Sequence, residues 1–375
     1  MKRFVSLLIA FYFLYHASAQ NIACYYDSHA TSYASPLLPD ALSAASCTHY
    51  IYIGIGLTVK GEIRLLNENF DTSTGFLTFQ NLRTPETKLL ILLGGIYESS
   101  ATFSTAVASY ADTLINNIAL FLARFNFDGI DIDWRYPGSR GGQPTDKANF
   151  QKFIIRLRAR LDMINKLLVV SVSPKKSVFE KAYDSITLSL YADMINVYAF
   201  NFTDEVENRT HNLAPMYSDF TSPTSVNSSI SDWISTKVRK GKINIVVATY
   251  ARTYTLARET RTTVGSPISG LGIAGSNTKQ AGYLAQYELC DVKSDYINVI
   301  DETTQTVYYT KDMSWITAET ADTLVQKYTF VLDNALGGAA IYALDWDDWK
   351  NACGMGSFAA VALAQEYLYS GTKLA

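Results

Sequence analysis

Eight short runs of apolar and β-branched residues recur along the chain, separated by longer amphipathic stretches. Runs such as KLLILLGG and LLVVSVSP are apolar on consecutive residues, which is typical of parallel strands that are buried on both faces. Between the runs, apolar residues recur at helical spacing over 109–125 and 145–164. This alternation predicts an α/β fold, and a closed (β/α)8 barrel more readily than an open sheet. The strands are expected at 21–27, 49–57, 88–95, 127–134, 167–174, 192–201, 243–252 and 338–347.

One interval, 253–315, breaks this rhythm. It contains the Gly-rich segment GSPISGLGIAG and the strand-like segment VYYT where the alternation would place a helix. We therefore predict a subdomain that is inserted into the barrel at this point.

The composition is that of an ordinary soluble globular protein, with 48% hydrophobic and 18% charged residues. Positive and negative charges nearly balance, because 32 Lys and Arg residues stand against 35 Asp and Glu residues. A chain without excess positive charge is poorly suited to neutralise a phosphate backbone, so nucleic acid is not an expected partner.

The first residues have the pattern of a targeting segment. Two basic residues precede an apolar run over 4–15, and small residues follow at 17–19. This pattern predicts a signal peptide over 1–19, because the run is shorter than the ~20 residues that span a bilayer. We therefore expect a secreted, extracellular protein with no membrane segment; a membrane anchor formed by the same apolar run is the alternative.

The chain has four cysteines, whose separations match no zinc-binding pattern. In an oxidising compartment they should pair. The favoured pairing is Cys24 with Cys47 and Cys290 with Cys353, each closing a loop of moderate length, although three connectivities are possible.

Three N-x-[ST] sequons agree with secretion. They begin at Asn201, Asn208 and Asn227. Since Asn201 lies on a predicted strand of the barrel wall, we predict glycosylation at Asn208 and Asn227.

The clearest chemical signal lies in the fourth predicted strand, in the segment FDGIDIDWRYP. Alternation along a strand sends Asp131, Asp133 and Arg135 to one face, which is the barrel interior if the isoleucines face the helices. Charges there require partners, because an unpaired buried carboxylate is strongly disfavoured. We therefore predict an ion pair of Arg135 with Asp133 and Asp131, at the strand ends where barrels of this kind gather functional residues. The alternative is a polar ladder that only caps the barrel mouth.

On these residues the chain resembles the family 18 glycoside hydrolases, the chitinases and chitinase-like lectins. The family motif D-G-x-D-x-D-W-E-Y-P occupies 128–137 with one departure, because Arg135 stands in place of the glutamate. Further segments echo the family in order over nearly the whole chain, from CYY at 24–26 to ALD at 343–345. The resemblance implies a (β/α)8 TIM barrel of residues 20–252 and 316–375. It also implies that 253–315 forms a small α+β insertion domain between strand 7 and helix 7.

The resemblance implies substrate-assisted hydrolysis, in which the glutamate protonates the glycosidic oxygen and the N-acetyl carbonyl of the substrate attacks the anomeric carbon. Arg135 cannot supply that proton, because a guanidinium has a pKa above about 12. The family's M-T-Y-D segment reads YAFN at 198–201, so a tyrosine hydroxyl and an aspartate are also missing. The degenerate catalytic site consists of Asp131, Asp133, Arg135, Phe200 and Asn201.

Family members stack sugar rings on aromatic side chains, whose faces suit the apolar faces of pyranoses. Three family aromatics are altered, to Gly54, Ile96 and Tyr342. The resemblance carries over a sugar-binding set of Tyr26, Trp134, Tyr136, Tyr198, Tyr250, Tyr342 and Trp346, with Arg252 and Asp345 as polar candidates for sugar hydroxyls.

The resemblance implies a catalytically inactive chitinase-like protein that binds chitin or N-acetylglucosamine oligosaccharides in a reduced groove, with a lectin-like role in immunity, cuticle or growth. One alternative is a scaffold that binds a protein receptor and no glycan. Another is residual chitin hydrolysis by a different carboxylate, for which Glu98, Glu205 and Glu207 are candidates. We expect a monomer with no cofactor and no metal.

Overall fold

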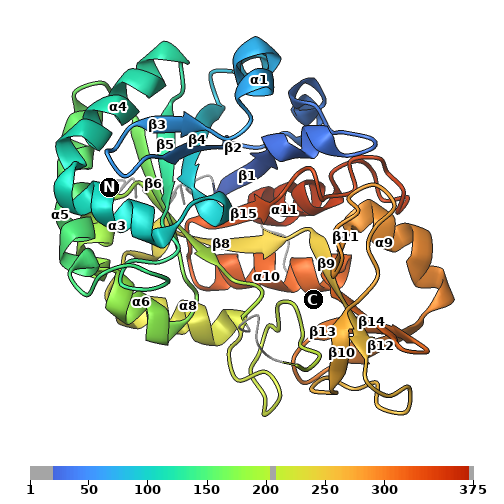
Figure 1. The fold of residues 1–375 in the computed structure, drawn as a ribbon. Coiled ribbons are helices and arrows are strands. Elements are labelled where there is room, and N and C mark those ends of the chain that lie inside the picture. The colour runs from blue at the N-terminus through green and yellow to red at the C-terminus, as the bar shows by residue number, and fades with distance from the viewer. Residues whose placement is uncertain (1–19, 203–207, 371–375) are drawn as a thin grey trace, which may run out of the picture.

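The computed structural model describes residues 20–202 and 208–370, and its centre is a closed barrel (Figure 1). Eight strands pair in parallel all the way round, and the ring closes between the first and second strands. The (β/α)8 prediction is therefore confirmed. The barrel strands are β1 (Asn21–Asp27), β2 (His49–Leu57), β4 (Lys88–Gly94), β5 (Gly129–Asp133), β6 (Leu167–Val172), β7 (Met194–Tyr198), β8 (Ile243–Ala248) and β15 (Gly338–Tyr342).

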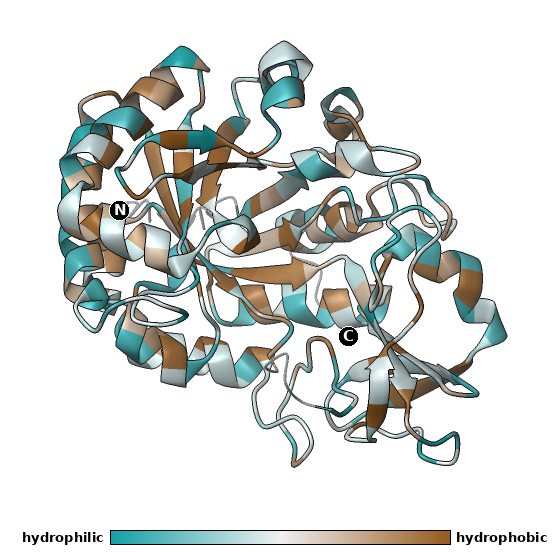
Figure 2. Ribbon diagram, viewed as in Figure 1, coloured by the Kyte–Doolittle hydropathy of each residue, from teal (hydrophilic) through white to brown (hydrophobic). Residues whose placement is uncertain are grey.

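Helices cover the outside of the barrel (Figure 1). The two helices expected from the apolar spacing are present as α4 (Ala111–Arg124) and α5 (Asp146–Asp162), slightly shorter than predicted. Their apolar faces, for example Leu114 and Ile118 of α4, are buried against the strands. Figure 2 shows the apolar strands inside and the more polar helix faces outside. The other covering helices are α3 (Ser100–Ser109), α6 (Lys176–Ala182), α7 (Ser185–Tyr191), α8 (Val226–Ser235), α10 (Ala321–Asp333) and α11 (Ala359–Ser370).

Smaller elements complete the barrel unit. The strand β3 (Ile63–Leu65) pairs antiparallel with β2, and the short helices α1 (Glu68–Phe70) and α2 (Phe76–Phe79) follow it. Within residues 20–202 and 208–370, no single helix is both long and apolar enough to cross a membrane. Helices α3 and α4 reach that length and composition only when they are counted together, and the chain bends sharply between them.

A second, antiparallel sheet follows β8 (Figure 1). It starts with β9 (Tyr250–Leu256) and ends with β14 (Ser314–Ala318), so it begins three residues before the predicted insertion and ends three residues after it. The expected strand at 243–252 is in fact two strands, because the chain leaves the barrel at Thr249 and Tyr250–Arg252 pair with β11. The remaining elements of this unit are β10 (Ile268–Leu271), β11 (Tyr283–Ala285), α9 (Gln286–Val292), β12 (Ile297–Asp301) and β13 (Thr306–Lys311).

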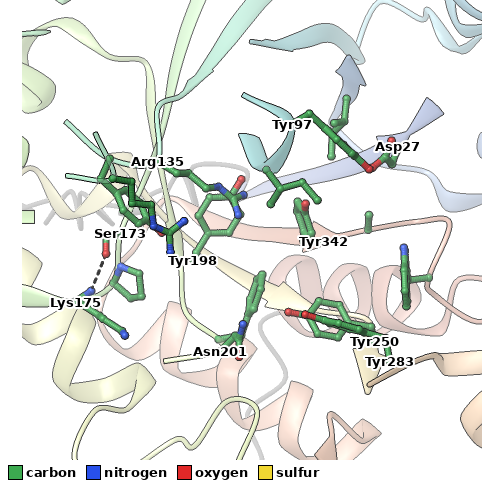
Figure 3. Close-up of a pocket in the computed structure, with 18 of the residues that line it drawn as sticks. Asp27, Tyr97, Arg135, Ser173, Lys175, Tyr198, Asn201, Tyr250, Tyr283 and Tyr342 are labelled. Atoms are coloured by element: carbon green, nitrogen blue, oxygen red, sulfur yellow. Dashed lines mark hydrogen bonds between the residues drawn. The ribbon is translucent and has the colours of Figure 1, made fainter. Parts of the chain in front are cut away.

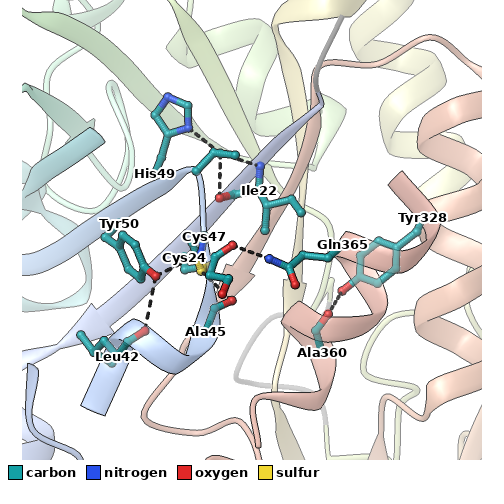
Figure 4. The surroundings of a disulfide bond; sticks show 12 residues. Ile22, Cys24, Leu42, Ala45, Cys47, His49, Tyr50, Tyr328, Ala360 and Gln365 are labelled. Carbon is teal, nitrogen blue, oxygen red and sulfur yellow. Dashed lines mark hydrogen bonds between the residues drawn. A yellow bond between two sulfur atoms is a disulfide. The ribbon is translucent and has the colours of Figure 1, made fainter. Parts of the chain in front are cut away.

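Two disulfides link distant parts of the chain, and both have the predicted pairing. Cys24 of β1 is joined to Cys47, which precedes β2, and Figure 4 shows this bond beside Tyr50 and α11. Cys290 of α9 is joined to Cys353, beyond the last barrel strand, so this bond ties the second sheet unit to the barrel.

The predicted glycosylation sites lie at the surface to different degrees. Asn208 is exposed, and Asn227 is half-buried in the first turn of α8. The third sequon residue, Asn201, lines the cleft described below and its backbone N–H donates to the Leu213 carbonyl. Glycosylation at Asn208 and Asn227 stays a prediction.

Candidate functional site

A cleft of about 350 Å³ opens at the carboxyl ends of the barrel strands (Figure 3). Parallel barrels gather functional side chains at this end, because every strand delivers the residues that follow it to one rim. The rim residues that line the cleft include Asp27 at the end of β1, Arg135 after β5, Ser173 after β6, Tyr198 at the end of β7 and Tyr342 at the end of β15.

The centre of the site is an ion pair between Arg135 and Asp133. The Arg135 Nε donates to both carboxylate oxygens of Asp133, at 3.1 and 3.0 Å, and Nη2 donates to one of them at 2.8 Å. The Asp133 side chain is only 1% exposed, while that of Arg135 is 16% exposed and faces the cleft. Tyr198 donates its hydroxyl to Asp133 at 2.7 Å, and the guanidinium carbon of Arg135 lies 4.3 Å from the centre of the Tyr198 ring. Arg135 is therefore held in one place by charge, hydrogen bonds and a cation–π contact.

Arg135 remains a cation in this setting. Burial, the largest single influence, acts to lower the pKa of the guanidinium, but the charge of Asp133 and the neighbouring tyrosines outweigh it and raise that pKa well above its ordinary value. A group with so high a pKa cannot act as a general acid near neutral pH.

Asp131 does not join this pair, and the prediction that it would contact Arg135 is wrong. Its Oδ2 accepts hydrogen bonds of 2.8 Å from the hydroxyls of Tyr25 and Ser171, deeper in the barrel. The side chain is fully buried and its Oδ1 has no partner within the described residues. Burial, reinforced by the nearby charge of Asp133, raises the pKa of Asp131 to about 7.

The raised pKa of Asp131 predicts a pH-dependent stability. Because the folded state holds the proton up to about pH 7, whereas the unfolded chain releases it near pH 3.8, the contribution of Asp131 is present below about pH 4 and is lost as the pH rises to about 7. The variant Asp131→Asn cannot titrate, so its free energy of unfolding should rise relative to the native protein by roughly 3 kcal/mol between pH 5 and pH 8. Urea unfolding of both proteins at the two pH values measures this difference. If the difference in free energy of unfolding between the two proteins were the same at pH 5 and pH 8, the inference that folded Asp131 holds a proton at pH 5 would be wrong.

Aromatic side chains form much of the remaining wall. Phe200 packs against Tyr342 with ring centres 5.8 Å apart, and Tyr250 contacts Trp346 at 5.8 Å and Tyr283 at 5.5 Å. Of the residues predicted for the site, those that line the cleft are Arg135, Tyr136, Tyr198, Phe200, Asn201, Tyr250, Tyr342 and Trp346.

Two predicted sugar-binding aromatics are instead core residues, and these assignments are corrected. Tyr26 is 0% exposed and donates its hydroxyl to the Leu37 carbonyl at 3.0 Å. Trp134 is 1% exposed, stacks on Phe103 at 5.3 Å and donates its ring N–H to Ser100. The reason is alternation along the chain, which places Tyr26 and Trp134 on the face opposite to the inward-pointing residues beside them.

The predicted roles of Arg252 and Asp345 also differ from their positions in the structure. Neither residue is part of the cleft lining among the described residues. Arg252 donates to the hydroxyl of Tyr283 at 2.5 Å, and its guanidinium lies over the same ring at 4.3 Å. Asp345 is 1% exposed and accepts a hydrogen bond from the backbone N–H of Asp27 at 3.1 Å. Both side chains therefore contact residues of the cleft wall, Tyr283 and Asp27.

The sequence prediction missed a polar cluster at the other end of the cleft. The Asp27 carboxylate accepts the Tyr97 hydroxyl at 2.6 Å and the His29 backbone N–H at 2.9 Å, and it lies 3.0 Å from the His29 ring. The hydrogen bond to Asp27 raises the pKa of His29 despite the opposing effect of burial. Tyr97 could have been found from the sequence, because it directly follows the GGI segment at the end of β4.

Of the alternative acids proposed from the sequence, Glu98 is described by the structure, and it does not line this cleft. The Glu98 side chain, 6% exposed, accepts hydrogen bonds from the backbone of Leu57 and Ser99 and pairs with Arg64 at 3.1 Å. Glu205 and Glu207 lie outside the described residues. Within 20–202 and 208–370, no group of three or more His, Cys, Asp or Glu side chains is arranged to hold a metal ion.

Comparison with known proteins agrees with this arrangement. The glycosyl hydrolases family 18 model matches residues 21–347. Probable chitinase 10 of Drosophila melanogaster is 28% identical over 90% of the chain, which spans only 16% of that relative's length. The Group IV chitinase of Ostrinia furnacalis, solved in complex with allosamidin, superposes with a TM-score of 0.91 at 26% identity, covering 94% of this chain and 100% of the other.

A second solved structure is human YKL-39, described as a pseudo-chitinase with retained chitooligosaccharide binding properties. It superposes with a TM-score of 0.87 at 26% identity, and the match covers 94% of this chain and 100% of the other. Since the family model matches most of the sequence and the barrel superposes on both structures, the chain belongs to glycosyl hydrolases family 18.

Proposed function

We propose that the protein is a secreted, catalytically inactive chitinase-like protein that binds chitin or N-acetylglucosamine oligosaccharides in the cleft. The observation that carries the proposal is the position of Arg135 at the centre of the cleft, held there by Asp133 and Tyr198. Family hydrolysis needs a carboxylic acid at this position to protonate the leaving oxygen, whereas a guanidinium keeps its protons.

No other carboxyl group of the described residues is placed to replace that acid. Asp131 has a suitable pKa, but it is fully buried and does not line the cleft. Asp27 does line the cleft, but Figure 3 shows it well away from Arg135, beside Tyr97. The loss of the tyrosine hydroxyl at Phe200 removes a further group on which substrate-assisted catalysis depends.

Binding is proposed to survive because a wall suited to sugar rings is present. Tyr136, Tyr250, Tyr342 and Trp346 all line the cleft, and aromatic faces pack well against the apolar faces of pyranoses. The two solved relatives support this inference, since one was solved with allosamidin and the other is described as retaining chitooligosaccharide binding. The two disulfides support secretion, because such bonds persist in oxidising compartments.

The test is calorimetric titration with chitotetraose. Replacing Trp346 by Ala should weaken binding roughly tenfold, since a buried aromatic anchor contributes more than about 1.4 kcal/mol. Trp349→Ala is the matched control, because Trp349 is also half-buried and follows closely in sequence but does not line the cleft. Native protein that gives no heat with chitotetraose would discard the glycan-binding proposal.

That negative result would favour the alternative of a protein-interaction scaffold without a glycan ligand. One observation agrees with it: Ile96, which stands where the family has a tryptophan, lines the cleft and is 62% exposed. Reducing ends released from chitin oligosaccharides by the native protein would instead favour residual hydrolysis.

A further inference from the structure

Two arginines that lie close in the chain, Arg135 and Arg140, line the cleft. Arg135 follows β5, and Arg140 lies five positions further on in the next loop. The Arg140 guanidinium lies 5.5 Å from the centre of the Tyr136 ring, and Tyr136 itself lines the cleft. Arg140 therefore lies over the Tyr136 ring, whereas Arg135 lies over the ring of Tyr198.

Arg135 retains hydrogen-bonding capacity toward the cleft. A guanidinium has five N–H donors, and the contacts with Asp133 use only its Nε and Nη2. Its Nη1 makes no hydrogen bond to any residue in the described part of the chain, and the side chain is 16% exposed. Because Asp133 and the Tyr198 ring already hold the group in place, a ligand acceptor can bind it without ordering a flexible side chain.

Arg140 supplies a charge that this part of the protein does not neutralise. It is exposed, and it has no ion pair with a residue of 20–202 or 208–370.

The anionic side chain that lines the cleft among the described residues is Asp27, and it lies elsewhere. Figure 3 shows Asp27 with Tyr97 on the side opposite to Arg135. The Asp27 carboxylate accepts hydrogen bonds from Tyr97 and His29 and makes no ion pair with Arg135 or Arg140. Asp133 balances the charge of Arg135, so Arg140 is the group that makes this part of the described lining positive.

We propose that the cleft prefers N-acetylglucosamine oligosaccharides in which some sugars carry a carboxylate over neutral ones of the same length. The carboxylate pairs with Arg135 Nη1 and Arg140, while a neighbouring ring packs against the aromatic wall of Tyr250, Tyr342 and Trp346. Planar carboxylates suit guanidinium groups, because two parallel N–H donors meet two oxygens. This inference names a ligand class for the same cleft and rests on the proposed function only in that the cleft binds sugars.

The test compares two tetrasaccharides with one backbone. Chitotetraose is neutral, whereas a β-1,4-linked tetrasaccharide of alternating N-acetylglucosamine and N-acetylmuramic acid carries carboxylates. The native protein should bind the acidic tetrasaccharide roughly three- to tenfold more tightly at low ionic strength, and the preference should shrink as salt screens the charges. A hyaluronan tetrasaccharide, which carries its carboxylates on uronic acids, is the second acidic probe. Comparing the two acidic ligands shows whether the cleft binds carboxylates of muramic acid, of uronic acid or of both.

The decisive variant is Arg140→Gln, which should reduce the ratio of the two affinities toward one. Lys240→Gln is the matched control, because Lys240 is exposed just before β8, at the opposite end of the barrel, and should leave the ratio unchanged. Thermal unfolding confirms that both variants are folded.

Three results would overturn the inference. They are equal affinities of the native protein for neutral and acidic ligands, a preference that survives Arg140→Gln, and a preference that does not respond to salt. Equal, measurable affinities would refute this inference and leave the proposed function intact. A protein that binds only the acidic ligand would refute the proposed binding of chitin oligosaccharides and leave the preference for carboxylates intact. A protein that binds none of the ligands would refute both proposals.

Discussion

The double variant Arg135→Glu/Phe200→Tyr is expected to hydrolyse chitin oligosaccharides, at a rate roughly 10² to 10⁴ times that of the native protein. The first change supplies a carboxylic acid where the leaving oxygen would lie, and a general acid is worth about that factor. The second returns a hydroxyl beside the acetamido carbonyl that attacks in substrate-assisted catalysis. Asp133 next to the introduced carboxyl group raises the pKa of that new acid toward neutral, because two adjacent carboxylates resist joint ionisation.

The matched control is Arg135→Gln/Phe200→Tyr, which has nearly the same shape but no proton to donate. Release of reducing ends from chitohexaose measures the rates, with both single variants assayed alongside. Arg135→Glu alone should gain little while Phe200 lacks its hydroxyl. If the glutamine double variant hydrolysed chitohexaose as fast as the glutamate double variant, the proposal that Arg135 stands in the position of the missing acid would be refuted.

Replacing Arg135 by Met is expected to destabilise the fold by about 3–5 kcal/mol. The Asp133 side chain is 1% exposed, and removal of its cation leaves a buried carboxylate that only the Tyr198 hydroxyl contacts directly among the described side chains. Breaking one half of a buried ion pair costs this much because the remaining charge is not solvated. Chemical denaturation monitored by fluorescence gives the free energy of unfolding.

The control for this measurement is a surface ion pair. Arg156 pairs with Asp112 across the exposed faces of α5 and α4, with side chains 45% and 84% exposed. Arg156→Met should change stability by less than about 1 kcal/mol, because water and salt screen exposed pairs. Similar losses for the two variants would show that burial of the Arg135 pair has no special energetic role.

The barrel could be predicted from the sequence because buried parallel strands are apolar on consecutive residues. The limits of β1 and β2 agree with the prediction, but the strand expected at 243–252 continued past a turn at Thr249. Periodicity does not register that turn, because strand-forming residues continue across Thr249 from Ala248 to Tyr250. The change of partner from the barrel to the second sheet depends on tertiary pairing that no local pattern encodes.

The contacts of the site could be predicted where both residues belong to one strand, but not where they belong to different strands. Alternation along β5 led to the pair of Asp133 and Arg135, whereas the contact of Asp27 with Tyr97 joins residues 70 positions apart. The same alternation would have excluded Trp134 from the cleft had it been applied to the aromatics as well as to the charges. The family resemblance marks which segments reach the rim, but not which side chains of those segments face inward.

The way in which the second sheet joins the barrel bears on how this cleft can change. One residue separates β8 from β9, and the segment between β9 and β14 contributes Tyr250, Gln280 and Tyr283 to the cleft wall. A chimera that exchanges residues 250–318 with a relative would transplant that wall as a module and leave the eight barrel strands untouched. It would also require a cysteine in the donor segment to meet Cys353, which lies outside the graft. Recombination at these two joints would therefore change the cleft wall in one step, which substitution of single residues at the barrel rim cannot do.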